Sequence, residues 1–364
     1  MPTLFEPLTL AHGPAMKNRF ALAPLTNQQS HADGTLSDEE FRWLTYRAEG
    51  GFALTMTCAS HVQAVGLGFP GQLGNFGEQH MPGLERLAAA IKGFGSIAVM
   101  QLHHAGYRSP REVIGEAPVG PSDDEATGSR ALSTGEVEQL VEDFIAAAER
   151  CDRSGFDGVE AHGAHSYILC QFLSAELNRR TDRYGGSAEN RARVVREIIT
   201  GIRARCRPDF SLGIRLSPER FGLKVMEIRE LARQLMTEAA LDYIDLSLWD
   251  YAKLPVEEEH QDRTLMGWFT DLDRGNVRLG CAGKIMTPAD AQACLDQGMD
   301  FVFLGRAGIL HHDYPKRLAA DPGFLPAQLP VSAEYLLGER LSPAFLDYMN
   351  NFPGFVAKEA LETA

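Results

Sequence analysis

Residues 157–167 read Asp-Gly-Val-Glu-Ala-His-Gly-Ala-His-Ser-Tyr. The short apolar run around Val159 is typical of a buried strand that is entered through a glycine. Three polar rings, those of His162, His165 and Tyr167, follow where this strand would end. Three polar rings that follow the end of one strand together indicate a functional site.

The rings allow three interpretations. They can be partly buried structural side chains whose hydrogen bonds are satisfied. His162 and His165 can be ligands for zinc or iron, since imidazole is a common metal ligand. Alternatively, paired imidazole N–H groups can bind an oxygen on which negative charge develops, with Tyr167 as the acid. These residues alone leave all three interpretations open.

The bulk composition narrows the class of protein. The chain has 364 residues, of which 44% are hydrophobic and 23% charged, as expected for a globular protein with an ample core. A net charge of −14 with no compensating Lys/Arg cluster disfavours nucleic acid and anionic membranes as partners. The six cysteines are scattered, which predicts reduced thiols, and the N-terminus lacks a signal-peptide pattern. We therefore expect a soluble, cytoplasmic protein with no membrane span.

Apolar runs of strand length alternate with amphipathic helical patterns along the chain. We expect eight strands, at 20–25, 52–57, 97–102, around 159, 212–216, 243–248, 277–280 and 301–306. Parallel strands need helical crossovers, and eight such units predict a closed (β/α)8 barrel, with a doubly wound open sheet as the alternative. The prediction is one domain over 1–364, with the barrel at about 17–320 and a polar C-terminal tail at 321–364.

In such a barrel the active site lies where strands end and the following loops begin. This rule gathers around one mouth Thr26, Ala59, Gln101, His103, His104, His162, His165, Tyr167, Arg215, Gly283 and Arg306. Two long aperiodic loops, at 103–133 and 249–273, follow strands and are expected to be functional or mobile. Their sequences do not indicate which of their residues line a pocket.

The residues at this mouth favour a nucleotide-like cofactor over a metal. Residues 282–283 (Ala-Gly) and 305–306 (Gly-Arg) follow the last two strands, where barrels commonly bind a phosphate. Arg215 is a cation inside an apolar strand, so it needs a buried carboxylate or an anionic ligand. Gln101 offers amide groups suited to the edge of a heterocycle. Clear carboxylate metal ligands are missing from the other strand ends.

Several motifs resemble the Old Yellow Enzyme family. They are Lys-Asn-Arg at 17–19, Ala-Pro-Leu-Thr at 23–26, Gln-Leu-His-His-Ala-Gly at 101–106, the run at 155–165, Asn-Arg-Arg-Thr-Asp-Arg-Tyr-Gly-Gly-Ser at 178–187, Arg-Leu-Ser-Pro at 215–218 and Leu-Gly-Arg at 304–306. The resemblance covers roughly the first 310 residues in a consistent order on the expected strands. The central motif is highly specific, whereas a Gly-Arg pair alone is not.

The resemblance implies a tightly, non-covalently bound flavin mononucleotide (FMN) that is reduced by NADPH or NADH. Ala23, Pro24, Leu25, Thr26 and Ala59 would line the isoalloxazine. Gln101 would bind its pyrimidine edge, and Arg215 would stabilise the reduced flavin near N1 and O2. Ala282, Gly283, Gly305 and Arg306 would hold the phosphate end.

The resemblance also implies reduction of activated C=C bonds in small enone-type substrates. His162 and His165 would donate to the substrate carbonyl oxygen, flavin N5 would deliver hydride to the β-carbon, and Tyr167 would protonate the α-carbon. Gln28 would contact the substrate, because it occupies a place where one branch of the family has a tyrosine. Thr26 stands where that branch has a cysteine, so a thiol-tuned potential is not expected.

Several alternatives remain open at this point. A flavin barrel could instead reduce nitro groups or nitrate esters, or demethylate its substrate. The chain could also be a metal-dependent barrel hydrolase that uses His162 and His165, or a non-catalytic flavin-binding partner protein. The tail has no obvious arginine that could reach a partner's site, so both monomer and homodimer are compatible with the sequence.

Overall fold

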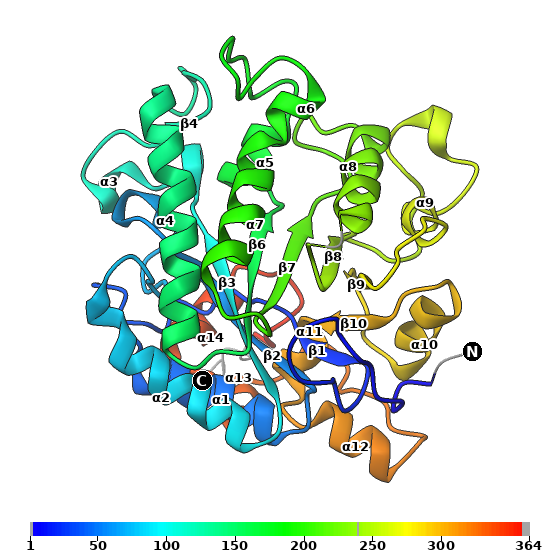
Figure 1. The fold of residues 1–364 in the computed structure, drawn as a ribbon. Helices are drawn as coiled ribbons and strands as arrows, with labels where there is room; N and C mark the ends of the chain where they lie inside the picture. The colour runs from blue at the N-terminus through cyan, green and yellow to red at the C-terminus, as the bar shows by residue number, and fades with distance from the viewer. Residues whose placement is uncertain (1–2, 239, 359–364) are drawn as a thin grey trace.

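The computed structural model describes residues 3–238 and 240–358, and its centre is a closed barrel of eight parallel strands (Figure 1). The strands are β1 (Phe20–Leu22), β2 (Leu54–His61), β3 (Ile97–His103), β6 (Gly158–Gly163), β7 (Ser211–Leu216), β8 (Tyr243–Ser247), β9 (Arg278–Ala282) and β10 (Phe301–Leu304). They follow one another around the barrel in chain order, and β10 closes on β1. The predicted (β/α)8 barrel is confirmed, and the open-sheet alternative is wrong.

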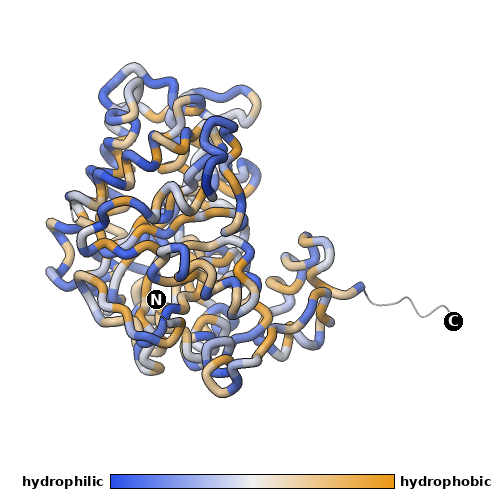
Figure 2. Tube along the Cα trace, turned by 90° about the vertical axis from the view of Figure 1, so that its right-hand side faces the viewer, coloured by the Kyte–Doolittle hydropathy of each residue, from blue (hydrophilic) through white to orange (hydrophobic). Residues whose placement is uncertain are grey.

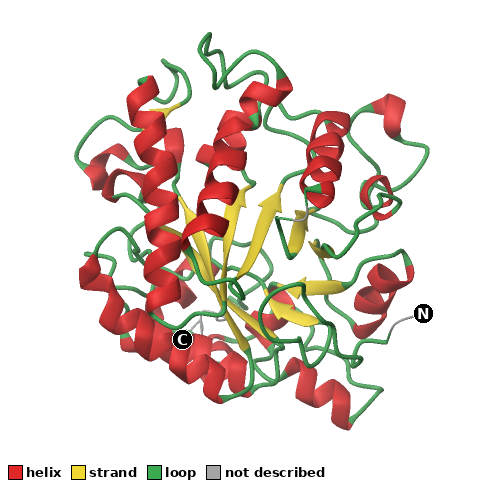
Figure 3. Cartoon of the chain, viewed as in Figure 1, coloured by secondary structure: helices red, strands yellow, loops and turns green. Residues whose placement is uncertain are grey.

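The helices lie outside the strands, as Figure 3 shows. The longer ones are α1 (Asp38–Glu49), α2 (Met81–Gly93), α4 (Thr134–Arg153), α7 (Arg193–Arg205), α8 (Val225–Thr237) and α10 (Pro288–Asp296). The shorter ones are α3 (Arg111–Ile114), α5 (Ile168–Leu173), α6 (Ala188–Arg191), α9 (Gly267–Thr270), α11 (Arg306–Leu310) and α12 (Tyr314–Ala320). None of the helices in the described ranges is long and apolar enough to cross a lipid bilayer.

Local sequence signals explain where these helices begin. The Ser37 side chain accepts a hydrogen bond from the Glu40 N–H and so caps α1, as its sequence predicts. Ser133 and Glu136 form a reciprocal capping box at the start of α4. Apolar residues of α4 at helical spacing, such as Leu140 and Phe144, are fully buried.

The lower part of the barrel interior is packed with large apolar side chains, including Met56, Val99, Phe301 and Phe303. The ring of Tyr243 shares this interior. A Cβ at position 213 would lie 2.2 Å from that ring, so only glycine leaves it room. Gly213 on β7 therefore leaves room for the ring of Tyr243, which the neighbouring strand β8 carries inside the barrel.

The C-terminal segment differs from the expected polar tail. Its described part contains α13 (Ala333–Gly338) and α14 (Pro343–Met349), and hydrophobic residues recur along it in Figure 2. The buried Phe345 ring packs against Trp43 of α1 with a centroid separation of 5.3 Å. Residues 359–364 of the expected tail lie outside the described residues. The hydrophobic cluster shared by barrel and segment supports the single domain, which stays a prediction.

The two long loops are largely irregular, as expected. The first contains η3 (Gly106–Arg108), α3 and the short pair β4 (Val119–Gly120) and β5 (Arg130–Ala131). The second contains η4 (Glu258–His260) and α9.

Candidate active site

A cavity of about 730 Å³ lies at the carboxyl ends of the barrel strands. Every predicted cofactor residue lines it, together with the three predicted rings: Ala23, Pro24, Leu25, Thr26, Ala59, Gln101, Arg215, Ala282, Gly283, Gly305, Arg306, His162, His165 and Tyr167. Gln28 is not among the lining residues, although it was predicted to contact the substrate. Its backbone is in the left-handed region, with φ 55°.

The three rings stand together at the end of β6. The His162 centroid lies 5.1 Å from that of His165 and 5.0 Å from that of Tyr167, with nearly perpendicular planes. His103, at the end of β3, packs edge-on against Tyr167 at 4.2 Å. The alternation of side chains in β6 and the sharp turn after it therefore bring the predicted residues into one group.

His162 and His165 are neutral. Burial, together with the neighbouring His165 and His103, holds the pKa of His162 well below its ordinary value. The Ala164 N–H donates to Nδ1 of His162 at 3.2 Å, so the neutral ring carries its proton on Nε2. Burial also lowers the pKa of His165 to about 3, and its Nε2 lies 2.6 Å from Oγ of Ser247. When Ser247 donates in that bond, the proton of His165 is on Nδ1.

A buried polar cluster lies beneath these rings. The Gln101 amide nitrogen donates to Glu160 at 2.7 Å, and Arg215 Nε lies 3.0 Å from Asp245. Glu160 and Asp245 are both fully buried, and burial raises the pKa of each carboxyl group. The structure thus supplies the partner that the buried charge of Arg215 requires, and it leaves the Gln101 carbonyl oxygen for a ligand.

Sequence reasoning missed Glu160 and Asp245 as members of the site. Glu160 precedes His162 by two residues on β6, so strict alternation places both on the same face. Asp245 is the register partner of Arg215 on the neighbouring strand. The alternation could have revealed Glu160, whereas Asp245 needed the strand register.

The part of the cavity where the sequence predicts a phosphate has the features of an anion site. Gly283 lies so close to Tyr251 that a Cβ would be 2.9 Å from its backbone nitrogen, so only glycine fits there. Arg306 is exposed and lines the cavity, and no carboxylate of the described residues pairs with it. An unpaired cation between glycines, with a buried arginine and an amide farther in, suits a ligand that joins a phosphate to a heterocycle.

The C-terminal segment supplies a wall of the cavity that sequence reasoning missed. Tyr348, Met349, Phe352 and Phe355 all line it. Tyr348 is hydrogen-bonded to Thr26, and burial raises its pKa. Aromatic residues at positions 345, 348 and 352 follow helical spacing, which is the signal that could have indicated a packed segment there.

The loops contribute further residues to the cavity. Tyr107 and Arg108 come from the first loop, and Trp249 stands at the start of the second. Phe221 and Lys284, from two other loops, line it as well, as does Ser247 at the end of β8. Positions of this kind depend on loop conformation, which hydrophobic periodicity does not predict.

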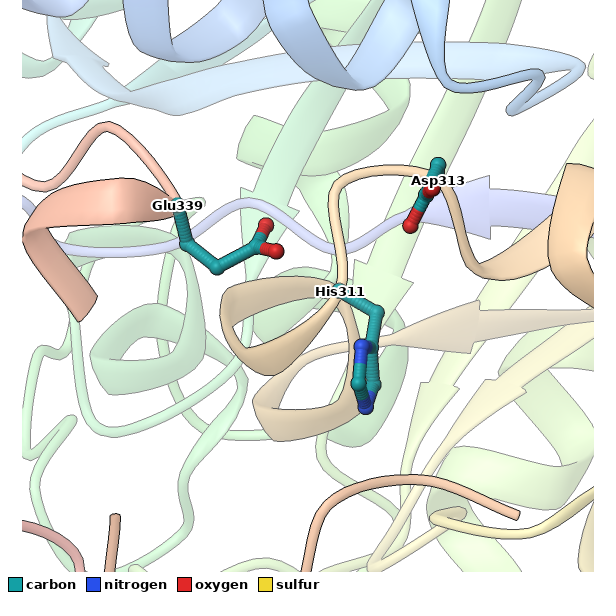
Figure 4. Close-up of side chains that lie close together, drawn as sticks. All are labelled: His311, Asp313 and Glu339. Carbon is teal, nitrogen blue, oxygen red and sulfur yellow. The ribbon is translucent and has the colours of Figure 1, made fainter. Parts of the chain in front are cut away.

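A second polar group lies away from this cavity, at the junction of the barrel and the C-terminal segment. Figure 4 labels its three members, His311, Asp313 and Glu339. His311 Nε2 accepts from the Ala327 N–H at 2.8 Å, and Arg317 donates to Asp313 at 2.7 Å. Glu339 accepts from His312 at 2.8 Å. The contacts of His311 with Ala327 and of Glu339 with His312 tie the segment to the barrel, so the group has a structural role.

A model of the NADH:flavin oxidoreductase / NADH oxidase family matches residues 3–322. The chain belongs to this family. The oxidoreductase is 37% identical, over 314 residues, to the probable NADH-dependent flavin oxidoreductase YqiG of Bacillus subtilis, a match that covers 83% of this chain and 84% of that protein. Some longer curated relatives are matched over only about a third of their length.

Two solved structures are similar to the oxidoreductase. One is the Old Yellow Enzyme homologue of Zymomonas mobilis, with a TM-score of 0.80, 25% identity, and coverage of 95% of this chain and 99% of that chain. The other is morphinone reductase in complex with tetrahydroNAD, with a TM-score of 0.77, 29% identity, and coverage of 92% and 94%. The resemblance to the Old Yellow Enzyme family is confirmed, and the chain is an FMN-dependent NAD(P)H oxidoreductase. The metal-dependent hydrolase is set aside.

Proposed function

We propose that this oxidoreductase reduces the activated C=C bond of α,β-unsaturated carbonyl compounds. The observation that carries the proposal is the convergence of His162, His165 and Tyr167 on one face of the cavity, with centroid separations of 5.0–6.3 Å. Two neutral imidazoles can donate hydrogen bonds to one oxygen, and a phenol beside them can supply a proton.

The residues that would hold FMN divide by chemistry. A mainly apolar wall for the isoalloxazine is offered by Ala23, Pro24, Leu25, Thr26 and Ala59. A place for the phosphate of FMN is offered by Ala282, Gly283, Gly305 and Arg306. The Gln101 carbonyl oxygen and the Arg215 guanidinium would face its pyrimidine side. When bound, FMN would supply the hydride chemistry, carrying reducing equivalents from NAD(P)H to the β-carbon of the substrate.

The chain's own residues act on the other half of the substrate. The Nε2–H of His162 and the ring N–H of His165 hold the carbonyl oxygen and stabilise the negative charge that develops on it. Tyr167 gives its hydroxyl proton to the α-carbon, so that one hydride and one proton complete the addition across the double bond. The Tyr167 phenolate regains its proton from solvent, which its half-buried position permits.

A comparison of electron acceptors tests the proposal. The protein, reduced anaerobically, is mixed separately with cyclohexenone, a nitroaromatic compound and a nitrate ester, and flavin reoxidation and products are recorded. We expect fast reoxidation by cyclohexenone with cyclohexanone as the product. Reoxidation by the nitro compound or the nitrate ester, with none by the enone, would overturn the proposal in favour of those reactions.

A further inference from the structure

His165 and Ser166 are two consecutive residues with left-handed backbone conformations, each with φ 59°. Neither is glycine, and side-chain-bearing residues keep this conformation only where their surroundings fix it. The two residues form the turn from β6 into α5, between the rings of His162 and Tyr167. The placement of the active-site rings therefore depends on what holds this turn.

Two neighbouring residues of the first long loop contact the turn directly. Nη1 of Arg108 donates to the carbonyl oxygen of His165 at 2.7 Å. The Tyr107 hydroxyl is hydrogen-bonded to the Ser166 hydroxyl. Both residues belong to η3, so a single short element engages both left-handed residues in succession.

The other side of the turn is held by buried groups. The His165 N–H donates to Oγ of Ser217 at 3.0 Å, and Nε2 of Gln171 donates to the carbonyl oxygen of Ser166 at 2.7 Å. Ser217 and Gln171 are at most 1% exposed. Tyr107 is half-buried and Arg108 is exposed, so the first long loop holds the turn from its solvent side.

Arg108 also contacts the ring of Tyr167. Its guanidinium carbon lies 4.8 Å from the ring centroid, within the range where a cation is attracted to an aromatic face. No carboxylate of the described residues pairs with Arg108. Its charge is instead directed at a carbonyl oxygen of the turn and at the Tyr167 ring, which places one side chain against both His165 and Tyr167.

We infer that Tyr107 and Arg108 are positioning residues that fix the left-handed turn at His165 and Ser166. By fixing this turn they set the positions of the His165 imidazole and the Tyr167 phenol. The inference rests on the proposed roles of His165 as an oxygen-binding donor and Tyr167 as the proton donor. Removing these contacts should impair binding of an oxyanion and proton delivery, while the flavin stays bound.

The test uses the FMN-loaded protein, three single variants of the two residues, the double variant Arg108→Met with Tyr107→Phe, and a control variant. Arg108→Met keeps the apolar stem and removes both guanidinium contacts, Arg108→Lys restores a cation, and Tyr107→Phe removes one hydroxyl. Arg111→Met is the matched control, because Arg111 is an exposed arginine of the same loop that does not line the cavity. Binding of 4-hydroxybenzaldehyde is followed through its long-wavelength charge-transfer band, and dithionite-reduced protein is mixed with cyclohexenone.

We expect Arg108→Met to weaken phenol binding and to slow reoxidation by about tenfold or more, since small misplacements of reacting groups cost large factors. Flavin content and Tm should match those of Arg111→Met, and Arg108→Lys should recover part of both losses. Tyr107→Phe should act in the same direction. In the double variant Arg108→Met with Tyr107→Phe, the losses of the two single variants should not add, because both residues hold one turn.

Unchanged phenol affinity and reoxidation in Arg108→Met and Tyr107→Phe would overturn the inference. So would losses that simply follow a fall in Tm and flavin content, because they would show a general structural role. A wild-type protein that neither binds the phenol nor is reoxidised by the enone would instead contradict the proposed function itself.

Discussion

His162 connects local geometry to chemistry most directly. A single backbone N–H, that of Ala164, fixes which ring nitrogen carries the proton, and burial keeps the ring neutral. A neutral donor in a buried cavity stabilises a developing oxyanion without a charge of its own to desolvate. The sequence also allowed His162 to be an ordinary buried structural histidine. In the site, that same burial keeps the ring neutral and so makes it a useful donor.

Tyr167→Phe tests the proton donor at this scale. Losing a positioned acid typically costs about 10²–10⁴-fold, so reoxidation by cyclohexenone should slow by roughly a hundredfold or more. Reduction by NADPH should change little, because that half-reaction needs no proton from the phenol. The two half-reactions are measured separately by anaerobic rapid mixing. Equal losses in both would contradict the assignment.

Glu160→Gln tests the buried carboxyl pair. Burial and the nearby Asp245 raise the pKa of the Glu160 carboxyl group above its ordinary value. Between the ordinary and the raised pKa the folded protein binds more protons than the unfolded chain, so the contribution of Glu160 to stability is complete below the ordinary pKa and is lost as the pH rises through the raised pKa. Wild type should therefore lose more stability than Glu160→Gln as the pH rises from mildly acidic to mildly alkaline. Identical pH profiles of the free energy of unfolding would contradict this.

At the residue scale, the sequence predicted the strand-end residues well, because the ends of parallel strands meet at one edge of a barrel. Ala59, Gln101 and Arg215 all lie where this rule places them. Gln28 does not line the cavity; it lies in the irregular segment that follows β1, where its backbone is left-handed. Hydrophobic periodicity does not predict where a side chain in such an irregular segment points.

At the element scale, α14 is the feature that hydrophobic patterning underestimated. It has only seven residues, so its helical period is short, yet it carries Tyr348 and Met349 into the cavity wall. Its stability comes from tertiary packing on α1, which a local pattern does not report. The same limit applies to η3, whose three residues include two that hold the active-site turn.

Phe345→Ala tests the anchoring of α14. The buried ring packs on Trp43, and removing a buried phenylalanine ring costs about 3–5 kcal/mol. We expect that loss in urea unfolding, together with weaker phenol binding, because the wall formed by Tyr348 loses its support. Leu337→Ala is the control, since Leu337 is 45% exposed on α13. If both variants were equally stable, α14 would not depend on this anchor.

At the scale of the whole molecule, the alternation of strands and helices predicted the barrel because eight right-length units close on themselves. Strand boundaries were correct to within a few residues, with β1 ending at Leu22, before Pro24. Closure pairs β1 with β10, and this brings Thr26 from one end of the barrel sequence and Arg306 from the other to one cavity. No local signal reports that proximity, whereas the topology requires it.

Arg306→Met tests the phosphate end that this closure creates. A lost charge-assisted contact is worth about 1.5–3 kcal/mol, which corresponds to roughly tenfold or more in the Kd for FMN. The affinity for riboflavin, which has no phosphate, should stay unchanged. Quenching of flavin fluorescence on titration of the apoprotein measures both. Equal weakening for the two flavins would place the phosphate elsewhere.

The central claim is tested most directly by the visible spectrum of the purified protein under anaerobic conditions, first alone, then with NADPH, then with cyclohexenone. We predict a yellow protein whose flavin absorbance bleaches with NADPH and returns with the enone. A flavin that bleaches and stays bleached when cyclohexenone is added would contradict the proposed reaction. A colourless protein that cannot be reconstituted with FMN would contradict the account of the site as a whole.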